Sequence, residues 1–185
     1  GSGTTQIADH NRFLIGVHIA HDVQVGSHCV ITNMVQIAGH CLIEDCCHIG
    51  GLTGLQSFTT IGRYAYITAM TRLGVDAPPY MVMYGYEPDV RGVNEKALKN
   101  RWRFSHEQVD RLWAAYKVLF SRTGGKGAIC ERIAALEAQG PHDEHVQYLL
   151  DSVKRSVQQG VYGRYLESKR RDTPEDRRAF YSDAR

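Results

Sequence analysis

Two histidines and an aspartate lie close together near the start of the chain, in the stretch His18-Ile19-Ala20-His21-Asp22. An imidazole titrates near neutral pH and can take a proton from an attacking hydroxyl or amine. An adjacent carboxylate can fix the imidazole tautomer and stabilise the imidazolium. These residues predict general-base chemistry, with His21 as the base and Asp22 as its orienting partner. The alternative is that His21 is only a turn residue.

The spacing of His18 and His21 also raises the question of a metal site. No cysteine or acidic residue completes a tetrahedral ligand set at a recognised spacing. We therefore expect no metal and no bound cofactor. The motifs typical of phosphate-binding loops, dinucleotide-binding folds and serine hydrolases are absent from the sequence as well.

A repeat of six residues predicts how these side chains are positioned. A bulky apolar residue recurs every six positions, and the residue four places later is small or β-branched in nearly every case. A period of six fits neither a helix nor an amphipathic strand, but it is typical of a parallel β-helix. The twelve positions are Ile7, Phe13, Ile19, Val25, Ile31, Ile37, Ile43, Ile49, Leu55, Ile61, Ile67 and Leu73.

Three such hexads make one triangular coil, so residues 18 apart in the sequence are expected to stack. This register places Gly39 directly beside His21, and His40 at the same turn. Glycine lets a backbone N–H approach a ligand closely, so Gly39 is predicted to donate to the oxyanion of an acyl-transfer intermediate. A structural β-solenoid without chemistry is the competing interpretation.

The composition changes near Pro78. Residues 1–78 contain 8 of the 42 charged residues and no lysine. The apolar spacing after Ser105 is helical, with expected helix ends at Gly124-Gly125, Gly140-Pro141 and Gly160. We predict a β-helix of about four coils over 1–78, and a helical domain with a connecting loop over 79–185. Residues 161–185 are expected to form a surface helix or a charged tail.

Composition also excludes several classes of protein. The chain is 43% hydrophobic and 23% charged, which is ordinary for a globular protein, and no apolar run is long enough for a membrane span. Five cysteines without a C-x-x-C pair favour a reducing cytoplasm over a disulfide framework. A nucleic-acid partner is not expected, because acidic residues interleave with Lys169-Arg170-Arg171.

The repeat resembles the left-handed β-helix of the hexapeptide-repeat acyltransferases. Its motifs are similar to those of the UDP-N-acetylglucosamine O-acyltransferases of lipid A biosynthesis. The resemblance implies a mainly β fold, a left-handed parallel β-helix followed by a C-terminal α-helical domain. The motifs that carry it are 18–22, Ile37-Ala38-Gly39-His40, Ile49-Gly50-Gly51-Leu52-Thr53, Asp76-Ala77-Pro78-Pro79-Tyr80 and Gly92-Val93-Asn94.

The same resemblance implies an activity and partners. An (R)-3-hydroxyacyl group would pass from acyl carrier protein to the 3-hydroxyl of UDP-N-acetylglucosamine, with the carrier thioester as co-substrate. The family forms homotrimers with active sites in the clefts between subunits. His18 and His40 would contact substrate, and Asn94 and Arg101 would lie near the nucleotide or the pantetheine arm.

The chain departs from the family pattern at several places, among them Glu87, which stands where a histidine often follows the Pro-Pro-Tyr loop. Gln56-Ser57 stands where the family commonly has His-Gln, which alters one substrate contact. Thr68-Ala69 replaces a Gly-Gly pair in the region that limits acyl length, which predicts a shorter or differently placed acyl chain. The family also has further coils ahead of the point where this chain begins, and these hold part of the nucleotide-sugar site.

Two alternatives to O-acyl transfer therefore stay open. The chain could be an N-acyltransferase acting on a nucleotide-linked amino sugar. It could also be a non-catalytic trimeric β-helix that binds acyl carrier protein. Whether the sequence is a fragment or a natural short form, and which sugar it takes, are left open by the residues.

Overall fold

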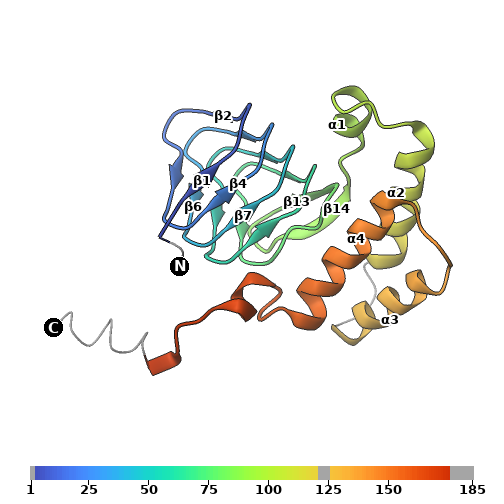
Figure 1. Cartoon of the computed structure of the whole chain (residues 1–185). Coiled ribbons are helices and arrows are strands. Elements are labelled where there is room, and N and C mark those ends of the chain that lie inside the picture. Colours follow the sequence, from blue (N-terminus) through green and yellow to red (C-terminus); the bar gives the residue numbers. More distant parts are fainter. Residues whose placement is uncertain (1–2, 121–125, 176–185) are drawn as a thin grey trace.

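The first half of the chain forms the predicted coils. A computed structural model describes residues 3–120 and 126–175 (Figure 1). It contains twelve two-residue strands, one in each hexad: β1 (Gln6–Ile7), β2 (Arg12–Phe13), β3 (His18–Ile19), β4 (Gln24–Val25), β5 (Val30–Ile31), β6 (Gln36–Ile37), β7 (Leu42–Ile43), β8 (His48–Ile49), β9 (Gly54–Leu55), β10 (Thr60–Ile61), β11 (Tyr66–Ile67) and β12 (Arg72–Leu73).

The strands stack into three parallel sheets, in the orders β1-β4-β7-β10, β2-β5-β8-β11 and β3-β6-β9-β12. The register is the predicted one: Val25 pairs with Ile43, and Ile43 with Ile61, each 18 residues further on. The predicted β-helix fold class is confirmed.

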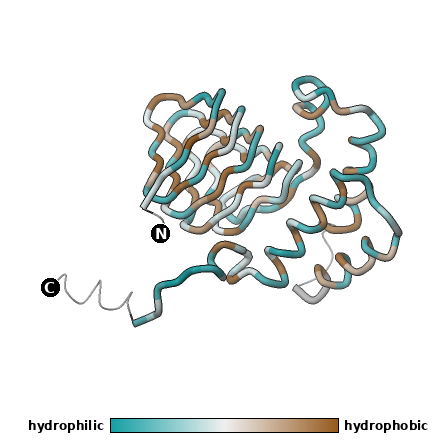
Figure 2. Tube along the Cα trace, viewed as in Figure 1, coloured by the Kyte–Doolittle hydropathy of each residue, from teal (hydrophilic) through white to brown (hydrophobic). Residues whose placement is uncertain are grey.

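The interior of the coils is filled by the large residue of each hexad. Those from Ile31 to Leu73 are almost fully buried, and Figure 2 shows apolar segments recurring in register from coil to coil. The first coil differs, since Ile7 is 49% exposed and Phe13 37%. Within the described chain no coil covers their outer side, and a solenoid buries its core only between neighbouring coils.

The segment after the coils is a hairpin, where a loop was expected. β13 (Met81–Tyr84) pairs in parallel with β11, and β14 (Asp89–Val93) pairs antiparallel with β13. Pro78 and Pro79 precede the ladder, so neither ring removes a ladder hydrogen bond. The prolines therefore end the period of six without ending the sheet.

Within the part of the chain that the structure describes, four α-helices follow: α1 (Glu95–Asn100), α2 (His106–Leu119), α3 (Lys126–Glu137) and α4 (Glu144–Lys154). Ser105 and Gln108 cap α2 with the predicted capping box. The predicted helix end at Gly124-Gly125 lies outside the described residues. Val90 of β14 packs against both the β-helix core and the helical core, so the domain boundary at residue 78 stays a prediction.

The predicted surface helix or charged tail over 161–185 is only partly observed, because residues 176–185 lie outside the described residues and residues 161–170 form a segment anchored on the last coil. After a π-helical turn, η1 (Arg155–Gln159), the chain folds back against the last coil and forms a short 3-10 helix, η2 (Leu166–Lys169). Oδ2 of Asp76 accepts the Tyr165 N–H at 2.8 Å and the Ser156 hydroxyl at 2.7 Å. The buried Arg164 guanidinium donates to the Gly74 carbonyl at 2.8 Å. These contacts fix the C-terminal segment below the β-helix (Figure 1).

None of the described helices combines the length and the apolar character that crossing a membrane requires.

Candidate active site

The predicted catalytic residues share one corner of the triangular coil, which we call the His21 corner. It consists of the stacked turns that follow β3, β6 and β9: His21-Asp22, Gly39-His40 and Ser57-Phe58. The second residue of each turn has a positive φ, 57° at Asp22, 63° at His40 and 65° at Phe58. This left-handed conformation lets a two-residue turn close each hexad, and Asp and His adopt it more readily than most side chains.

His21 and Asp22 form the predicted pair. Nδ1 of His21 lies 2.9 Å from Oδ2 of Asp22, and Oδ1 of the same carboxylate accepts the Gly3 N–H at 2.7 Å. The Asp22 side chain is only 10% exposed, whereas that of His21 is 72% exposed. The corner therefore presents an imidazole to solvent, backed by a shielded carboxylate.

Gly39 lies against the His21 ring. A Cβ atom at position 39 would lie 2.7 Å from Cε1 of His21 and 2.8 Å from Nε2. Both distances are below van der Waals contact, so any larger residue would displace the imidazole. The stacking confirms that the backbone of residue 39 borders the ring, while its role as oxyanion donor stays a prediction.

His40 completes the cluster. Its ring meets His21 edge-on at a centroid distance of 4.9 Å and stacks on Phe58 at 4.5 Å. Nδ1 of His40 lies 3.9 Å from Oδ2 of Asp22. Burial lowers the pKa of His40, and although Asp22 opposes this effect, His21 and Arg170 add to it. The neutral imidazole is therefore favoured at position 40.

The same three side chains could hold a cation. Ligand atoms of His21, Asp22 and His40 all lie within 4.8 Å of one another, and three protein ligands is the usual number at catalytic zinc sites. A sequence search for ligand spacing misses this group because His40 joins it only through coil stacking. The expectation that no metal is used stays untested.

A cavity of about 580 Å³ opens at the His21 corner. One side is formed by His21, His40, Ser57 and Phe58, and the other by residues 169–172 of the C-terminal segment. The 18-residue register places Ser57 and Phe58 here, but no sequence signal places residues 169–172.

His18 and Gln56 lie close to this corner along the chain. His18 is the outward residue of β3, on the sheet that leads into the corner, and it is exposed. Gln56 precedes the Ser57-Phe58 turn and is also exposed. Both side chains are therefore accessible on the same side of the β-helix, although neither lines the cavity.

Asn94 and Arg101 lie at a different corner, next to Tyr64. Asn94 is buried, and its side-chain amide donates to the Tyr64 carbonyl at 2.9 Å. Arg101 adds to the lowering of the pKa of His48, which burial causes in the main. Within one chain, Asn94 and Arg101 thus lie away from His21, and their predicted roles near the nucleotide or the pantetheine arm stay predictions.

Thr68 and Ala69 lie at the third corner, where large apolar side chains are exposed. We call it the apolar corner. The sheet formed by β3, β6, β9 and β12 runs from the apolar corner to the His21 corner. The exposed apolar residues are Ile15 (71%), Met34 (48%), Leu52 (63%) and Met70 (71%).

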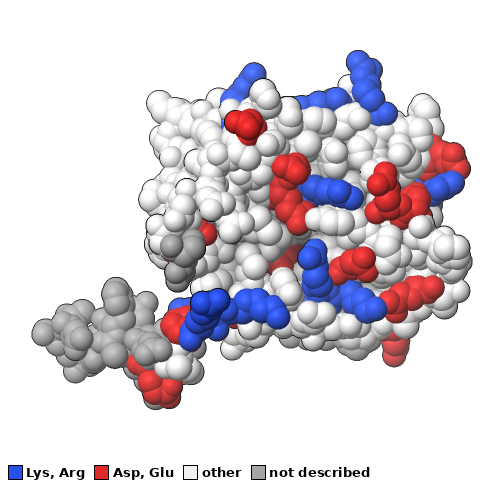
Figure 3. Space-filling view, viewed as in Figure 1, with Lys and Arg blue, Asp and Glu red and all other residues white. Residues whose placement is uncertain are grey.

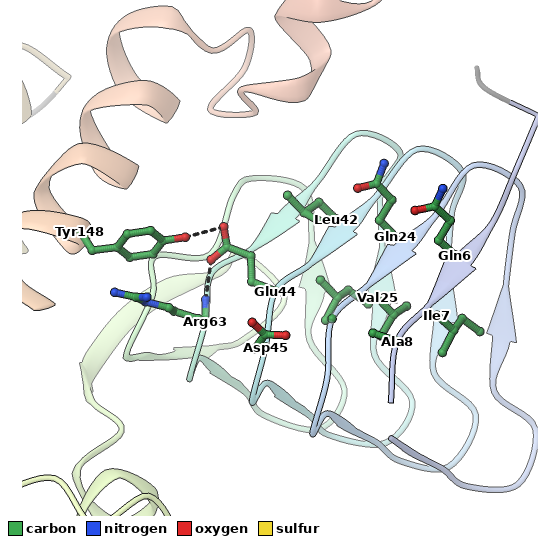
Figure 4. Close-up of a pocket in the computed structure, with 12 residues that line it drawn as sticks. Gln6, Ile7, Ala8, Gln24, Val25, Leu42, Glu44, Asp45, Arg63 and Tyr148 are labelled. Atoms are coloured by element: carbon green, nitrogen blue, oxygen red, sulfur yellow. Dashed lines mark hydrogen bonds between the residues drawn. The ribbon is translucent and has the colours of Figure 1, made fainter. Parts of the chain in front are cut away.

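A second cavity of about 580 Å³ lies on the outer face of the sheet β1-β4-β7-β10 (Figure 4). Glu44 accepts the Tyr148 hydroxyl at 2.7 Å and the Arg63 N–H at 2.8 Å. Asp45 accepts the Ser27 N–H at 2.6 Å. Glu44 thus attaches α4 to the β-helix through Tyr148, and Asp45 joins two neighbouring coils. None of the predicted site residues lines this cavity.

Comparisons with known proteins agree with this architecture. Residues 76–162 match the family model described as "Udp N-acetylglucosamine O-acyltransferase; Domain 2". The chain is 34% identical over 154 residues to the acyl-[acyl-carrier-protein]--UDP-N-acetylglucosamine O-acyltransferase of Leptothrix cholodnii, covering 82% of this chain and 58% of that protein. It is 37% identical over 160 residues to the enzyme of the same name from Anaeromyxobacter dehalogenans, covering 85% and 61%.

Solved structures give the same result. A crystal structure of UDP-N-acetylglucosamine acyltransferase matches with a TM-score of 0.73 at 31% identity, covering 83% of this chain and 57% of that one. The Arabidopsis enzyme matches at 0.71 and 27% identity, covering 82% and 62%. The chain spans about three fifths of the length of the curated relatives, 58% and 61% of the two described above. Through its coils and the helical part that follows, the chain is similar in sequence and in fold to the UDP-N-acetylglucosamine O-acyltransferases.

Proposed function

We propose that this chain transfers an (R)-3-hydroxyacyl group from acyl carrier protein to the 3-hydroxyl of UDP-N-acetylglucosamine, a step of lipid A biosynthesis. The observation that carries the proposal is the His21 corner, where an exposed imidazole is bonded to a shielded carboxylate and borders a glycine backbone. Relatives bearing the name of this activity support it.

The proposed reaction begins with proton transfer to His21. Because Nδ1 faces Asp22, the proton of the neutral ring belongs on Nδ1 and leaves Nε2 free to accept one. Nε2 removes the proton of the sugar hydroxyl, whose oxygen forms a bond to the thioester carbonyl carbon. The resulting oxyanion would be stabilised by the Gly39 N–H.

Collapse of the intermediate breaks the carbon–sulfur bond. The imidazolium of His21 returns the proton to the departing pantetheine thiolate, which leaves the catalytic groups as they began. Asp22 stabilises the imidazolium in between. Every proton is accounted for by the substrates and His21, so the proposal calls on no cofactor beyond the carrier thioester.

We further propose a homotrimer with its sites in the clefts between chains. The residues predicted to contact substrate are divided among three corners of one chain, so a neighbouring chain is needed to assemble them. The exposed apolar corner supports the trimer, since a large exposed apolar patch marks an interaction surface.

An acyl chain could cross the sheet of β3, β6, β9 and β12 toward Ala69. All five cysteines are unpaired, which fits the cytoplasm.

A single assay separates the candidate functions. Acyl carrier protein thioester is offered with UDP-N-acetylglucosamine or its 3-amino analogue, and product is followed for wild type and His21→Ala. We expect O-acyl product and a fall in kcat of about 10²–10⁴-fold in the variant. The matched control is His106→Ala, an exposed histidine in the first turn of α2, outside the coils.

Three results would contradict the proposal. Product from the amine alone would indicate an N-acyltransferase. No product from either acceptor would indicate a non-catalytic β-helix. Unchanged turnover in His21→Ala would place the chemistry elsewhere.

A further inference from the structure

We propose that Lys169 and Arg171, held in place by Arg170, bind a phosphate group of the substrate at the His21 corner. The inference rests on the proposed function, because it concerns the ligand of the same site. Its first support is the cavity of about 580 Å³, which has His21 and His40 on one side and residues 169–172 on the other.

The segment that carries these cations is anchored on the β-helix. Asp76, in the last turn of the same corner, holds Tyr165 and Ser156, and Arg164 holds Gly74. These contacts span 80–90 residues of sequence and bring η2 beneath the His21 corner. The cations are therefore presented by an ordered part of the structure.

Arg170 is the positioning residue. Its guanidinium lies 5.0 Å from the centre of the Phe58 ring, and Phe58 in turn stacks on His40 at 4.5 Å. The same guanidinium is paired with Asp172 and Glu167. With its charge already paired, Arg170 fixes the segment against the corner and leaves ligand binding to its two neighbours.

Lys169 and Arg171 are both exposed, and among the described residues neither forms an ion pair. Lysine and arginine side chains gather where the C-terminal segment passes below the β-helix (Figure 3). Arginine and lysine are the side chains that recognise phosphate most often. The cavity thus offers uncompensated positive charge beside the proposed general base.

Both substrates of the proposed reaction carry phosphate. UDP-N-acetylglucosamine has a pyrophosphate, and the pantetheine arm of the carrier is attached through a phosphodiester. A pyrophosphate bound here would hold the attached sugar close to His21, whereas a bound phosphodiester would leave the thioester at the far end of the pantetheine arm. The match to the family model ends at residue 162, ahead of Lys169 and Arg171. The cations of the proposed phosphate site therefore lie outside the part of the chain that matches the family model.

The test compares ligand binding in the full chain, wild type and Lys169→Gln/Arg171→Gln. Calorimetry with uridine diphosphate reports on the nucleotide source, and calorimetry with 4′-phosphopantetheine reports on the carrier source. We expect the dissociation constant of one of the two to rise about tenfold or more in the double variant. Acyl-pantetheine lacks the phosphate. In the acyl-transfer assay, the double variant should therefore have the same KM for acyl-pantetheine as wild type.

Two controls keep the result interpretable. Arg155→Gln removes a charge beside Tyr165 without touching the cavity, and it should bind both ligands as wild type does. Lys169→Arg/Arg171→Lys keeps the charges and should retain binding, which separates charge from folding. Thermal midpoints check that every variant is folded.

The inference is overturned if the glutamine variant binds both ligands as tightly as wild type. It is also overturned if wild type binds neither ligand, or if the charge-conserving variant is equally impaired. These outcomes are independent of acyl transfer. A wild-type protein that binds uridine diphosphate but transfers no acyl group would refute the proposed function and leave this inference intact.

Discussion

Position 39 shows how one missing Cβ atom shapes the site. An alanine there would bring its Cβ within 2.7 Å of the His21 ring, which is exposed enough to move aside. Gly39→Ala should therefore lower kcat by about 10–100-fold through misplacement of the base, with a small change in thermal midpoint. Because alanine keeps the backbone N–H, the loss would report on the ring contact and not on oxyanion donation.

The matched control for this substitution is Gly140→Asn, between α3 and α4. No atom lies within 4 Å of a Cβ built at position 140, and its φ of 100° is a conformation that asparagine tolerates better than most side chains. This variant should retain wild-type kcat. Equal rates for Gly39→Ala and wild type would show that the His21 ring position has no part in the reaction.

His40 gives the protein a pH-dependent stability. Burial lowers its pKa below the ordinary 6.5, so the unfolded chain binds the proton more tightly than the folded one. The contribution of His40 to the free energy of unfolding is complete above pH 6.5 and declines as the pH falls toward the lowered pKa.

His40→Asn should therefore weaken the acid dependence of stability, and the φ of 63° at this position accommodates asparagine. Urea unfolding on both sides of pH 6.5 measures the effect for the variant and wild type. An identical pH slope in the two proteins would show that another group is responsible.

At the scale of the elements, stability comes from contact between neighbouring coils. Ile43 is fully buried between Val25 and Ile61, whereas Ile7 in the first coil is 49% exposed. Ile43→Ala should lower the free energy of unfolding by about 2–5 kcal/mol, because it removes apolar contact and leaves a cavity. Ile7→Ala removes the same atoms from a half-exposed site and should cost much less.

Denaturant unfolding of both variants checks this difference. Equal losses would mean that the first coil is as well covered in solution as the central ones. Such a result would point to an additional contact on Ile7.

For the whole molecule, the distribution of site residues over three corners predicts association. Sedimentation equilibrium should give a mass three times that of the chain. Leu52→Asp places a charge on the apolar corner, where Leu52 is 63% exposed. Burying an unpaired charge in an interface is costly, so this variant should dissociate and lose turnover together.

Tyr162→Ser provides the control, since Tyr162 is 78% exposed but lies on the C-terminal segment. It should remain associated and active. A monomeric wild type, or a monomeric Leu52→Asp that keeps full turnover, would contradict sites shared between chains.

The sequence by itself determined the coils and the core of the candidate site. The period of six is a local property, and three hexads fix the 18-residue register without any long loop. That register alone places Gly39 and His40 beside His21. The capping box of Ser105 and Gln108 can also be predicted from the sequence, because the two residues are only three positions apart.

Only the tertiary structure decided the remaining features. The hairpin of β13 and β14 depends on the pairing of β13 with β11. The sequence pattern does not predict this extension of the sheet, because the period of six stops at the two prolines before it. The C-terminal segment reaches the His21 corner through contacts such as Arg164 with Gly74, 90 residues apart. Such contacts depend on where folded elements meet in space, and no periodicity in the sequence encodes them.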